Sequence, residues 1–318
     1  MKILFYDGTR GYDPRQVVNR PTGGILTSLS IIPPYLARKR HDCTVGSLYM
    51  TAEDYNGVHY QPVMAPMEPS DVVVYNRNML GENSVRQALQ NKSRLIWWLH
   101  DIVDPRYLND SSFRKVDTIV ALSDYCVKTY SDFYDIPKEK FVVIPNGIAP
   151  AVWFPPKDFK KRDNDLFIFA SSPIKGYRAL DFVFNNVRRH RPNARLMIFA
   201  SQQLHNLPDS PLYIQWLENI KKQKGVIISQ PIPQEELSDL FRKAYTLLMP
   251  NEYPEICSNL LLQARACGLP VVTSPIGSAA EFIEHEETGM LSSYTPNDKF
   301  MWWYDYTMQV IKLIKKPE

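Results

Sequence analysis

Short apolar runs alternate with longer amphipathic stretches along the whole chain. The apolar runs are nearly continuous in Val, Ile and Leu, which is typical of parallel strands covered on both faces. Alternation of such strands with helices predicts an α/β fold built on a parallel sheet. Pro33 and Pro34 are expected to kink or split the first helix. In the first half, the pattern predicts strands over 2–6, 43–48, 71–75, 94–99, 116–121 and 140–144, and helices over 23–39, 82–91 and 123–134.

The second half of the chain repeats this scheme. A proline-rich and charged passage from Ile148 to Asp165 interrupts the pattern, so we interpret it as the link between two domains. At 318 residues, the chain is long enough for each domain to bury its own core. Beyond the link, the pattern predicts strands over 166–170, 195–199, 225–229, 245–249, 270–273 and 288–291, and helices over 176–190, 210–223, 233–243, 257–267 and 278–284.

Two doubly wound domains predict where a ligand binds. Ligands of open parallel sheets bind in the crevice beyond the carboxyl ends of the strands. We therefore expect the active site in a cleft between the two domains, lined by loops that follow strands. A residue on a loop after a strand can reach such a site, whereas a residue before a strand generally cannot.

Charge and cysteine content narrow the class of protein. The formal net charge is +3, and Lys and Arg lie in short clusters such as residues 38–40. We interpret these clusters as solvated surface, with contact to an anionic lipid or a polyanionic acceptor as the alternative. Nucleic acid is not an expected partner. The four cysteines include no C-x-x-C pair, so neither a zinc site nor a disulfide framework is expected.

The apolar runs are all short. None approaches the roughly 20 residues of a membrane-spanning helix, and the apolar start at residues 1–6 is too short for a signal peptide. A cytoplasmic protein is therefore expected, with peripheral contact at a membrane surface as the alternative.

The segment 255–272 carries the most specific chemistry. A carboxylate, Glu255, follows an apolar strand, and an apolar helix begins two residues later and ends near Gly268. Helix N-termini carry partial positive charge and N–H donors without intrahelical partners, so they bind phosphate groups. The layout predicts a diphosphate site at the helix start, with Glu255 and Gln263 available for hydroxyls. The residues at that start are Cys257, Ser258 and Asn259.

This segment resembles the signature of glycosyltransferase family 4, a large family of retaining enzymes with the two-domain GT-B architecture. The signature is a Glu, seven residues, a second Glu and then Ala-x-Ala-x-Gly-x-Pro-Val. Gln263 stands in the place of the second Glu. The resemblance implies that Glu255 contacts hydroxyls of the donor sugar and that Gln263 contacts the ribose. A neutral amide would make a hydrogen bond of about 1 kcal/mol there, roughly half of what a carboxylate would make.

The resemblance also implies domain boundaries. We expect an N-terminal Rossmann-like domain over 1–150 on the acceptor side and a C-terminal Rossmann-like domain over 151–297 on the donor side. Relatives use their last helix to cross back onto the first domain, so residues 298–318 are expected to complete it. The side chains expected to pack there are Trp302, Trp303 and Tyr306.

In the first domain, two loops that follow strands hold candidate site residues. Gly23 and Gly24 lie at the start of a helix, where the absence of side chains lets a ligand approach the backbone. They resemble the Gly-Gly pair beneath the donor phosphates and sugar in family 4. His100 follows a predicted strand, and in relatives a His here contacts the donor sugar near the reacting centre. Asp101 or Asp104 is expected to orient this histidine.

In the second domain, Ser172 and Lys175 follow the first strand. Relatives place an Arg and a Lys at this turn to hold the donor diphosphate; here the Lys is kept and a Ser replaces the Arg. Lys175 is therefore expected to be the main countercharge to the leaving nucleotide, with Arg178 as a candidate for the second charge. By the same resemblance, the loop at Pro231 and Ile232 is expected to line the pocket for the base.

The combined prediction is a metal-independent glycosyltransferase of the hexosyltransferase type. It would move a sugar from a nucleotide-diphosphate sugar to an acceptor hydroxyl with retention of anomeric configuration. Glu255, His100 and Lys175 are the expected catalytic residues. The expected donor is a UDP- or GDP-sugar, the expected acceptor is a glycan, a lipid-linked sugar or a protein, and no cofactor or metal is expected.

Two alternatives stay open. The first is a catalytically inactive relative that binds a nucleotide-sugar or glycan as a regulatory or partner protein, because the second Glu and the Arg of the family pattern are both replaced. The second is a metal-dependent glycosyltransferase, which would hold a divalent cation with Asp-x-Asp. The only such tripeptide, Asp163-Asn164-Asp165, precedes a predicted strand, which is the wrong edge of the sheet for a ligand.

Overall fold

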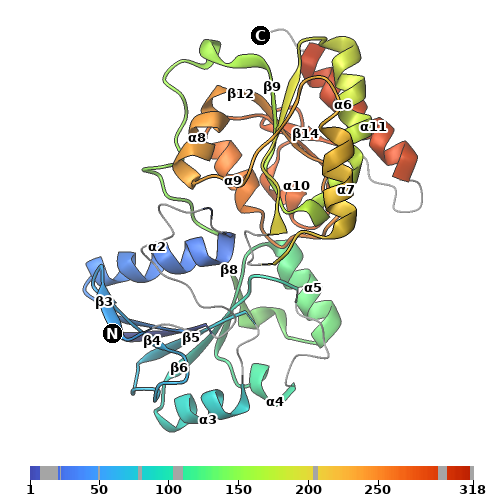
Figure 1. Ribbon diagram of the computed structural model, residues 1–318. Coiled ribbons are helices and arrows are strands. Elements are labelled where there is room, and N and C mark those ends of the chain that lie inside the picture. Colours follow the sequence, from blue (N-terminus) through green and yellow to red (C-terminus); the bar gives the residue numbers. More distant parts are fainter. Residues whose placement is uncertain are drawn as a thin grey trace. The chain divides into compact units, whose positions relative to one another are not determined.

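The computed structural model contains two compact units (Figure 1). The first domain is built from Gly24–Gly147 with the N-terminal strand, and the second from Ile148–Glu318. The division falls close to the boundary expected at 150. The structure describes residues 1–7, 21, 23–48, 51–77, 81–102, 110–202, 207–292 and 299–315, but not the side chains of 110, 111, 174 and 299–305.

The described residues of the first domain form an eight-stranded sheet in the order β3-β4-β2-β1-β5-β6-β7-β8. Neighbouring strands in this sheet are parallel, except that β3 and β4 are antiparallel. The strand order reverses between β1 and β5. The strands are β1 (Lys2–Asp7), β2 (Asp42–Ser47), β3 (Glu53–Tyr55), β4 (Val58–Pro62), β5 (Val72–Asn76), β6 (Arg94–Trp98), β7 (Thr118–Ala121) and β8 (Phe141–Val143).

The hairpin formed by β3 and β4 was not predicted. Asn56 and Gly57 join the two strands, and both adopt positive φ angles, of 52° and 76°. An Asn-Gly pair between short strands is a strong hairpin signal, because both central residues of the turn need positive φ. The sequence therefore contains the information, although the flanking runs are too short and polar to suggest strands.

Helices pack against this sheet. Pro33 and Pro34 do not split the first helix, which is continuous and buries both rings. Trp97 of β6 packs against Phe113 and Tyr130, with ring centroids 6.3 and 5.5 Å apart, so helical segments cover this face of the sheet. The helices are α2 (Gly24–Arg38), α3 (Glu82–Gln90), α4 (Asp110–Phe113) and α5 (Asp124–Tyr134).

The second domain contains a six-stranded parallel sheet in the order β11-β10-β9-β12-β13-β14 among its described residues. Numbered from β9, this order is 3-2-1-4-5-6, the doubly wound order in which ligands bind where the order reverses. That reversal lies between β9 and β12. The strands are β9 (Asp163–Phe169), β10 (Arg195–Ile198), β11 (Val226–Ile228), β12 (Ala244–Met249), β13 (Val271–Thr273) and β14 (Gly289–Leu291).

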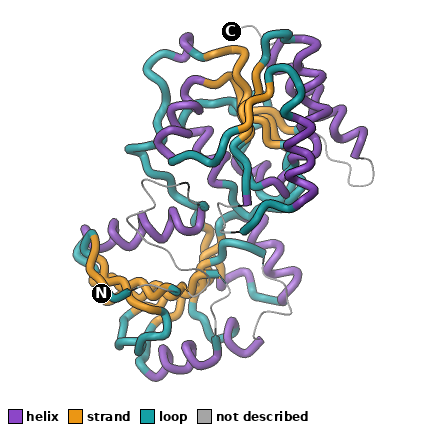
Figure 2. The backbone as a smooth tube through the Cα atoms, in the orientation of Figure 1, coloured by secondary structure: helices purple, strands orange, loops and turns teal. Residues whose placement is uncertain are grey.

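Helices cover both faces of the second sheet (Figure 2). Successive residues of β9 point to opposite faces: Phe167 and Phe169 belong to one buried cluster, and Leu166 and Ile168 to the other. The first cluster includes residues of α6, α7 and α11, and the second includes residues of α8, α9 and α10. These helices are α6 (Tyr177–His190), α7 (Pro211–Ile220), α8 (Gln234–Lys243), α9 (Asn259–Ala266), α10 (Ala279–Phe282) and α11 (Lys299–Lys315).

The expectation that the last helix completes the first domain is wrong for the described part of α11. Tyr306 and Val310 are fully buried in the second domain, where α11 packs against α6, β13 and β14. The Tyr306 hydroxyl donates to the Val272 carbonyl oxygen at 2.6 Å and accepts from the Met249 N–H at 2.8 Å. The apolar side of α11 therefore covers the second sheet. The side chains of Trp302 and Trp303 lie outside the described residues.

The cysteines are free thiols, with Cys43, Cys126 and Cys267 buried and Cys257 partly exposed. Within the described part of the chain, no helix has the length and apolar character needed to cross a membrane.

Candidate active site

The second sheet brings two predicted loops together at its point of strand reversal. Ser172 and Lys175 follow β9, and Glu255 follows β12; these two strands are neighbours. Parallel strands end at the same edge of a sheet, so both loops lie at that edge. The structure thus assembles residues that are 80 positions apart in the sequence.

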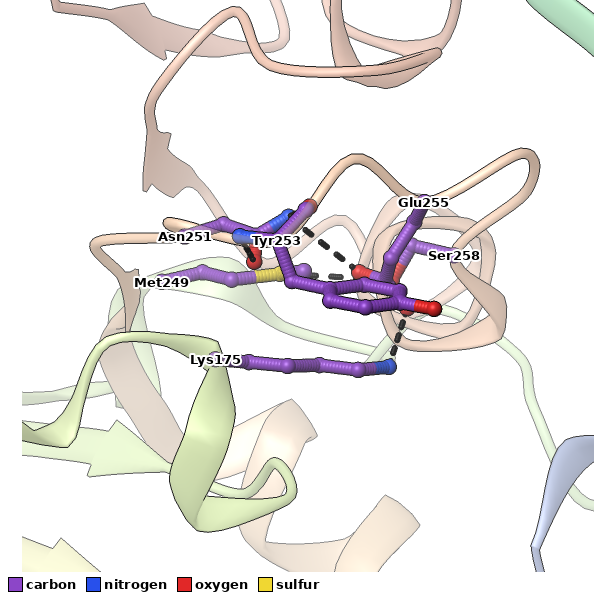
Figure 3. Close-up of polar contacts among 6 residues, drawn as sticks. All are labelled: Lys175, Met249, Asn251, Tyr253, Glu255 and Ser258. Carbon is purple, nitrogen blue, oxygen red and sulfur yellow. Dashed lines mark hydrogen bonds and ion pairs between the residues drawn. The ribbon is translucent and has the colours of Figure 1, made fainter. Parts of the chain in front are cut away.

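Lys175 and Glu255 form an ion pair at this edge (Figure 3). The Lys175 Nζ donates to the Glu255 Oε1, and the two side chains are 24% and 12% exposed. Water screens a pair this buried less than it screens a surface pair, so the interaction is stronger than that of an exposed ion pair. The pair is the charged centre of the candidate site.

Asn251 holds the other oxygen of Glu255 and was not predicted from the sequence. Its Nδ2 donates to the Tyr253 carbonyl oxygen at 2.7 Å and lies 3.4 Å from the Glu255 Oε2, while its Oδ1 accepts from the Tyr253 N–H at 3.0 Å (Figure 3). The Ser274 hydroxyl donates to the Asn251 carbonyl oxygen at 2.5 Å. Asn251 therefore fixes both the loop and the carboxylate. The sequence feature that could have identified Asn251 is its position two residues after the buried strand β12.

Two glycines let the surrounding loops approach closely. Gly176 has a φ of 108°, and a Cβ there would lie 1.7 Å from the Pro250 carbonyl oxygen. Gly277 has a φ of 66°, and its Cβ would lie 2.3 Å from the Glu255 carbonyl oxygen. At each of the two positions, the positive φ angle and the close contact exclude any residue with a side chain. The turn that carries Lys175 and the loop that carries Glu255 thus depend on these glycines.

Helix α9 begins beside this ion pair, close to its predicted start. Ser258 is the N-cap residue with extended backbone, but its side chain does not cap the helix. Its hydroxyl donates instead to the Met249 sulfur at 4.0 Å (Figure 3). Cys257 is partly exposed and Asn259 is the first helical residue. The helix start, with its partial positive charge, therefore lies on the same loop as Glu255.

Gln263 is buried on α9, four residues after Asn259 and so on the same side of the helix. Pro231 and Ile232 follow β11 and precede α8, and Ile232 packs on the core between the sheet and α8 to α10. Arg178, the candidate for a second charge, lies over the Tyr177 ring and donates to its hydroxyl at 3.3 Å. Whether these residues bind a nucleotide stays a prediction.

On the loops that follow β9 and β12, two buried polar atoms have no hydrogen-bond partner among the described residues. They are the Ser172 Oγ and the Glu252 Oε1. Ser172 precedes the turn Pro173–Lys175, and its carbonyl oxygen accepts from the Lys175 N–H at 3.0 Å. Buried polar atoms are nearly always satisfied, so these two indicate a place where water or a ligand completes the contacts. Sequence reasoning missed Glu252.

In the first domain, Gly24 begins α2 and Gly23 precedes it, on the chain that follows β1. His100 follows β6, is 8% exposed and lies against Trp98, with ring centroids 4.3 Å apart. Burial lowers the pKa of His100 to about 3, with a smaller contribution from the positive charge of Arg77. His100 is therefore neutral at physiological pH.

Asp101 does not have the expected role. Its carboxylate forms an ion pair with Arg77, and its carbonyl oxygen accepts from the Tyr130 hydroxyl at 2.7 Å. Arg77, which directly follows β5, therefore holds the Asp101 carboxylate. A positively charged guanidinium attracts a carboxylate more strongly than a neutral imidazole does. Asp104, the other candidate, lies outside the described residues.

The Asp-x-Asp tripeptide lies at the opposite edge of the second sheet. Asp163 and Asp165 begin β9, so the strand starts earlier than predicted, and they pair with Arg195 and Arg191. Among the side chains that the structure describes, no cluster of three or more His, Cys, Asp or Glu is arranged to hold a metal ion.

The second domain also matches a known protein family. Residues 165–301 match the family described as glycosyl transferases group 1. The matched residues include both loops of the Lys175–Glu255 pair and helix α9.

Similar proteins and structures extend the likeness over the whole chain. The putative glycosyltransferase YtcC of Bacillus subtilis is 22% identical over 317 residues, covering 87% of this chain and 77% of its own. The structure of sucrose-phosphate synthase from Thermosynechococcus elongatus has a TM-score of 0.77 at 15% identity, covering 99% of this chain and 90% of that one. The structure of Anabaena HepE in complex with UDP-glucose has a TM-score of 0.66 at 17% identity, covering 99% and 94%.

These findings confirm two predictions. The architecture of two parallel-sheet α/β domains is that of GT-B glycosyltransferases, and the protein is of the glycosyltransferase class. Retention of configuration, independence from metal, membership of family 4 and the roles of individual residues stay predictions.

Proposed function

We propose that the protein transfers a sugar from a nucleotide-diphosphate sugar to an acceptor hydroxyl, with retention of configuration and without a metal. The observation that carries this proposal is the Lys175–Glu255–Asn251 arrangement at the strand reversal of a group 1 glycosyltransferase domain. The HepE structures were solved with UDP-glucose and with UDP, which supports a UDP-sugar as the donor. The acceptor we propose is a glycan, a lipid-linked sugar or a protein.

The diphosphate would bind at the start of α9. Backbone N–H groups at a helix start attract an anion, and Lys175 adds a full positive charge at the same edge. Negative charge grows on the leaving diphosphate as the glycosidic bond breaks, so groups that are already aimed at it accelerate the reaction most. An arriving diphosphate competes with Glu255 for Lys175.

Glu255 would then hold hydroxyls of the donor sugar. Its Oε1 loses part of its contact with Lys175 when the lysine turns to the diphosphate, while Asn251 keeps the Oε2 in place. The carboxylate is thus free to accept hydrogen bonds without losing its orientation. Fixing the orientation of a bound substrate lowers the barrier, because the entropy of alignment has already been lost on binding.

His100 would act as a neutral hydrogen-bonding group. With a pKa of about 3 it carries no charge at neutral pH, so it can contact a sugar hydroxyl but contributes no positive charge to the transition state. A catalytic role through proton transfer at neutral pH is also disfavoured, because the basicity of such an imidazole is low.

The test is release of nucleotide from a panel of UDP-, GDP- and ADP-sugars, with and without simple acceptors. We expect turnover with at least one donor, and strong loss in Glu255→Ala and Lys175→Ala. The matched controls are Glu287→Ala and Lys222→Ala, which remove exposed side chains of the same domain. Near-wild-type activity in either site variant would remove that residue from the site. Analysis of the product anomer by NMR decides between retention and inversion.

An inactive relative that binds a nucleotide-sugar or glycan as a regulatory partner is the second candidate function. It is favoured by the replacements at Ser172 and Gln263, and by the pairing of Lys175 with Glu255, which neutralises the charge meant for the diphosphate. Donor binding without turnover, even toward water, would support this candidate and contradict the first.

Independence from metal has a separate test. Asp163 and Asp165 are paired with arginines at the edge away from Lys175, which disfavours them as ligands of a donor-bound cation. We expect donor turnover to be unchanged in excess chelator. Loss of turnover that is restored by Mg²⁺ or Mn²⁺ would support the metal-dependent alternative.

A further inference from the structure

The amino ends of the strands form the edge of the second sheet opposite the candidate active site. In Figure 1, β9 starts at the upper end of the second domain, and the segment 154–162 leads into it. Strands β9, β12 and β13 are parallel neighbours, so the residues that precede them lie together at this edge. Helices α8 and α9 end immediately before β12 and β13, and so at the same edge. Residues from three separate segments therefore meet here, away from the edge that carries Lys175 and Glu255.

The segment that leads into β9 exposes two aromatic rings. Phe154 is 44% exposed and Phe159 is 53% exposed. Among the phenylalanines that the structure describes, the only other one exposed to this extent is Phe133, which lies in the first domain. Guanidinium groups flank both rings: Arg242 lies 4.1 Å from the Phe154 ring centroid, and Arg162 lies 5.3 Å from that of Phe159. Single exposed apolar side chains are common, whereas two rings on one short segment favour a contact surface.

The segment is anchored in the conformation that exposes these rings. At one end, Arg162 donates to two backbone carbonyl oxygens of neighbouring segments, at 3.0 and 2.8 Å. At the other end, the Val152 carbonyl oxygen accepts from the Ser238 hydroxyl at 2.6 Å. A Cβ on Gly268 would lie 2.7 Å from the Phe159 ring, so this ring already rests against backbone. The exposure of the rings is therefore a fixed property of the second domain.

Lysines surround the two rings. Lys157, Lys160 and Lys161 are exposed on the same segment, and Lys243 is exposed at the end of α8. None of these four has an ion-pair partner among the side chains that the structure describes. The Asp158 Oδ1 accepts from the Lys160 N–H at 3.0 Å. A basic residue at a helix end stabilises the helix dipole, which accounts for Lys243 but not for Lys157. The edge thus presents unpaired positive charge beside the rings.

The rings distinguish between possible anionic partners. Positive charge alone would fit any polyanion, but a soluble polyanion would contact the lysines and leave the rings in water. An anionic bilayer can take up both kinds of side chain. Its headgroup phosphates attract lysines, and aromatic rings are stabilised at the boundary between the headgroups and the acyl chains.

We propose that this surface docks the protein on a membrane of anionic phospholipids. Its residues, which we term the amino-edge surface, are Phe154, Lys157, Phe159, Lys160, Lys161 and Lys243. The lysines contact lipid phosphates, and the rings enter the interface between them. This role is separate from the proposed sugar transfer, because the amino-edge surface lies at the opposite edge of the sheet from Lys175 and Glu255.

Co-sedimentation with vesicles tests the charged part of the surface. The wild type should bind vesicles of equal parts phosphatidylcholine and phosphatidylglycerol, but not vesicles of phosphatidylcholine alone. Each lysine near an anionic surface strengthens binding by roughly five-fold, so the triple variant Lys157→Glu, Lys160→Glu, Lys161→Glu should bind the anionic vesicles at least about 10²-fold more weakly. The control makes the same change in net charge at three exposed lysines of the first domain and should bind nearly as the wild type does. These are Lys92→Glu, Lys115→Glu and Lys138→Glu.

Replacement of the rings tests the apolar part. The double variant Phe154→Ser, Phe159→Ser should bind the anionic vesicles about ten-fold more weakly, because less apolar surface enters the interface. Its binding to inorganic polyphosphate should equal that of the wild type. Phe133→Ser is the control and should leave both kinds of binding unchanged. Urea denaturation checks the fold of each variant, and Phe154→Ser alone replaces the double variant if the latter does not fold.

Three outcomes would overturn the proposal. The first is a wild type that does not bind the anionic vesicles. The second is an equal loss of binding in the two lysine triple variants, which would show that net charge alone is responsible. The third is vesicle binding that polyphosphate abolishes and ring replacement leaves unchanged, which would identify a site for soluble polyanions instead.

Discussion

The points of strand reversal in the two sheets carry opposite kinds of polar site. In the second domain, Lys175 and Glu255 pair with each other and Asn251 contacts the same carboxylate, so the two opposite charges neutralise each other within the protein. In the first domain, Arg77 and Asp101 pair with each other, while Asn76 and His100 keep unpartnered atoms among the described residues. Similar strand orders therefore support a charged, internally paired site and a neutral one with open hydrogen-bonding capacity.

This difference fits two ligand chemistries. In the proposed function, a diphosphate would compete with Glu255 for Lys175, and the ion pair would neutralise this partly buried cation before the ligand binds. The unpartnered atoms of Asn76 and His100, by contrast, belong to uncharged groups, which favour an uncharged hydrogen-bonding partner over a diphosphate.

Replacing Glu255 with Ala should have the largest effect. The change removes a positioning carboxylate and leaves Lys175 without its partner in a largely buried position. We expect kcat for donor turnover to fall by about 10²- to 10³-fold, in the range seen when one preorganised polar group is lost from an active site. Steady-state kinetics with the best donor of the nucleotide-sugar panel measures this.

A double-mutant cycle with Lys175→Met sharpens the first prediction. Because the two side chains contact each other, their effects should not add, and the double variant should be less impaired than the product of the single losses. Full additivity would contradict a shared role for the pair. Circular dichroism of all three variants controls for loss of fold.

Replacing Gly176 with Ala tests whether the geometry of the Lys175–Glu255 pair depends on backbone approach. The new Cβ would lie 1.7 Å from the Pro250 carbonyl oxygen and the residue would keep a positive φ, so the turn must shift. We expect a loss of about 3 kcal/mol in the free energy of unfolding, measured by urea denaturation. Gly147→Ala is the control, because a Cβ there meets no atom within 4 Å. Equal stability of the two variants would show that the approach is not required.

Most of the fold and two residues at the centre of the candidate site could be predicted from the sequence. Lys175 and Glu255 were found because each follows an apolar run within a recognisable local motif. Asn251 was missed because its contacts, such as the hydrogen bond that its carbonyl oxygen accepts from Ser274 after β13, join segments that no local pattern brings together. The pattern of α11 indicates which side is apolar but not which sheet it covers, so Tyr306 was assigned to the wrong domain.

The pH dependence of stability tests the buried, neutral state of His100. Its folded pKa of about 3 lies below the value of about 6.5 expected in the unfolded chain, so the unfolded chain takes up the proton first as the pH falls. The stability linked to neutral His100 is therefore complete above about pH 6.5 and is lost progressively toward pH 3. Relative to His100→Phe, the wild type should lose up to about 1.4 kcal/mol per pH unit in this window. Parallel pH profiles of unfolding free energy would contradict the burial of this imidazole.

Replacing Gln263 with Glu should have the smallest effect. The side chain is buried on α9, so a new carboxylate loses hydration and is destabilised. If it accepts a hydrogen bond from a ribose hydroxyl, that bond is roughly 1 kcal/mol stronger than the one made by the amide. These two effects oppose each other, and we expect the affinity for UDP to change by less than about ten-fold.

Comparing the binding of UDP and 2′-deoxy-UDP isolates the contact with the 2′-hydroxyl of the ribose. If the preference for UDP is larger in Gln263→Glu than in the wild type, the side chain contacts that hydroxyl. A collapse of binding to both nucleotides would contradict a role confined to the 2′-hydroxyl, because 2′-deoxy-UDP lacks only that hydroxyl.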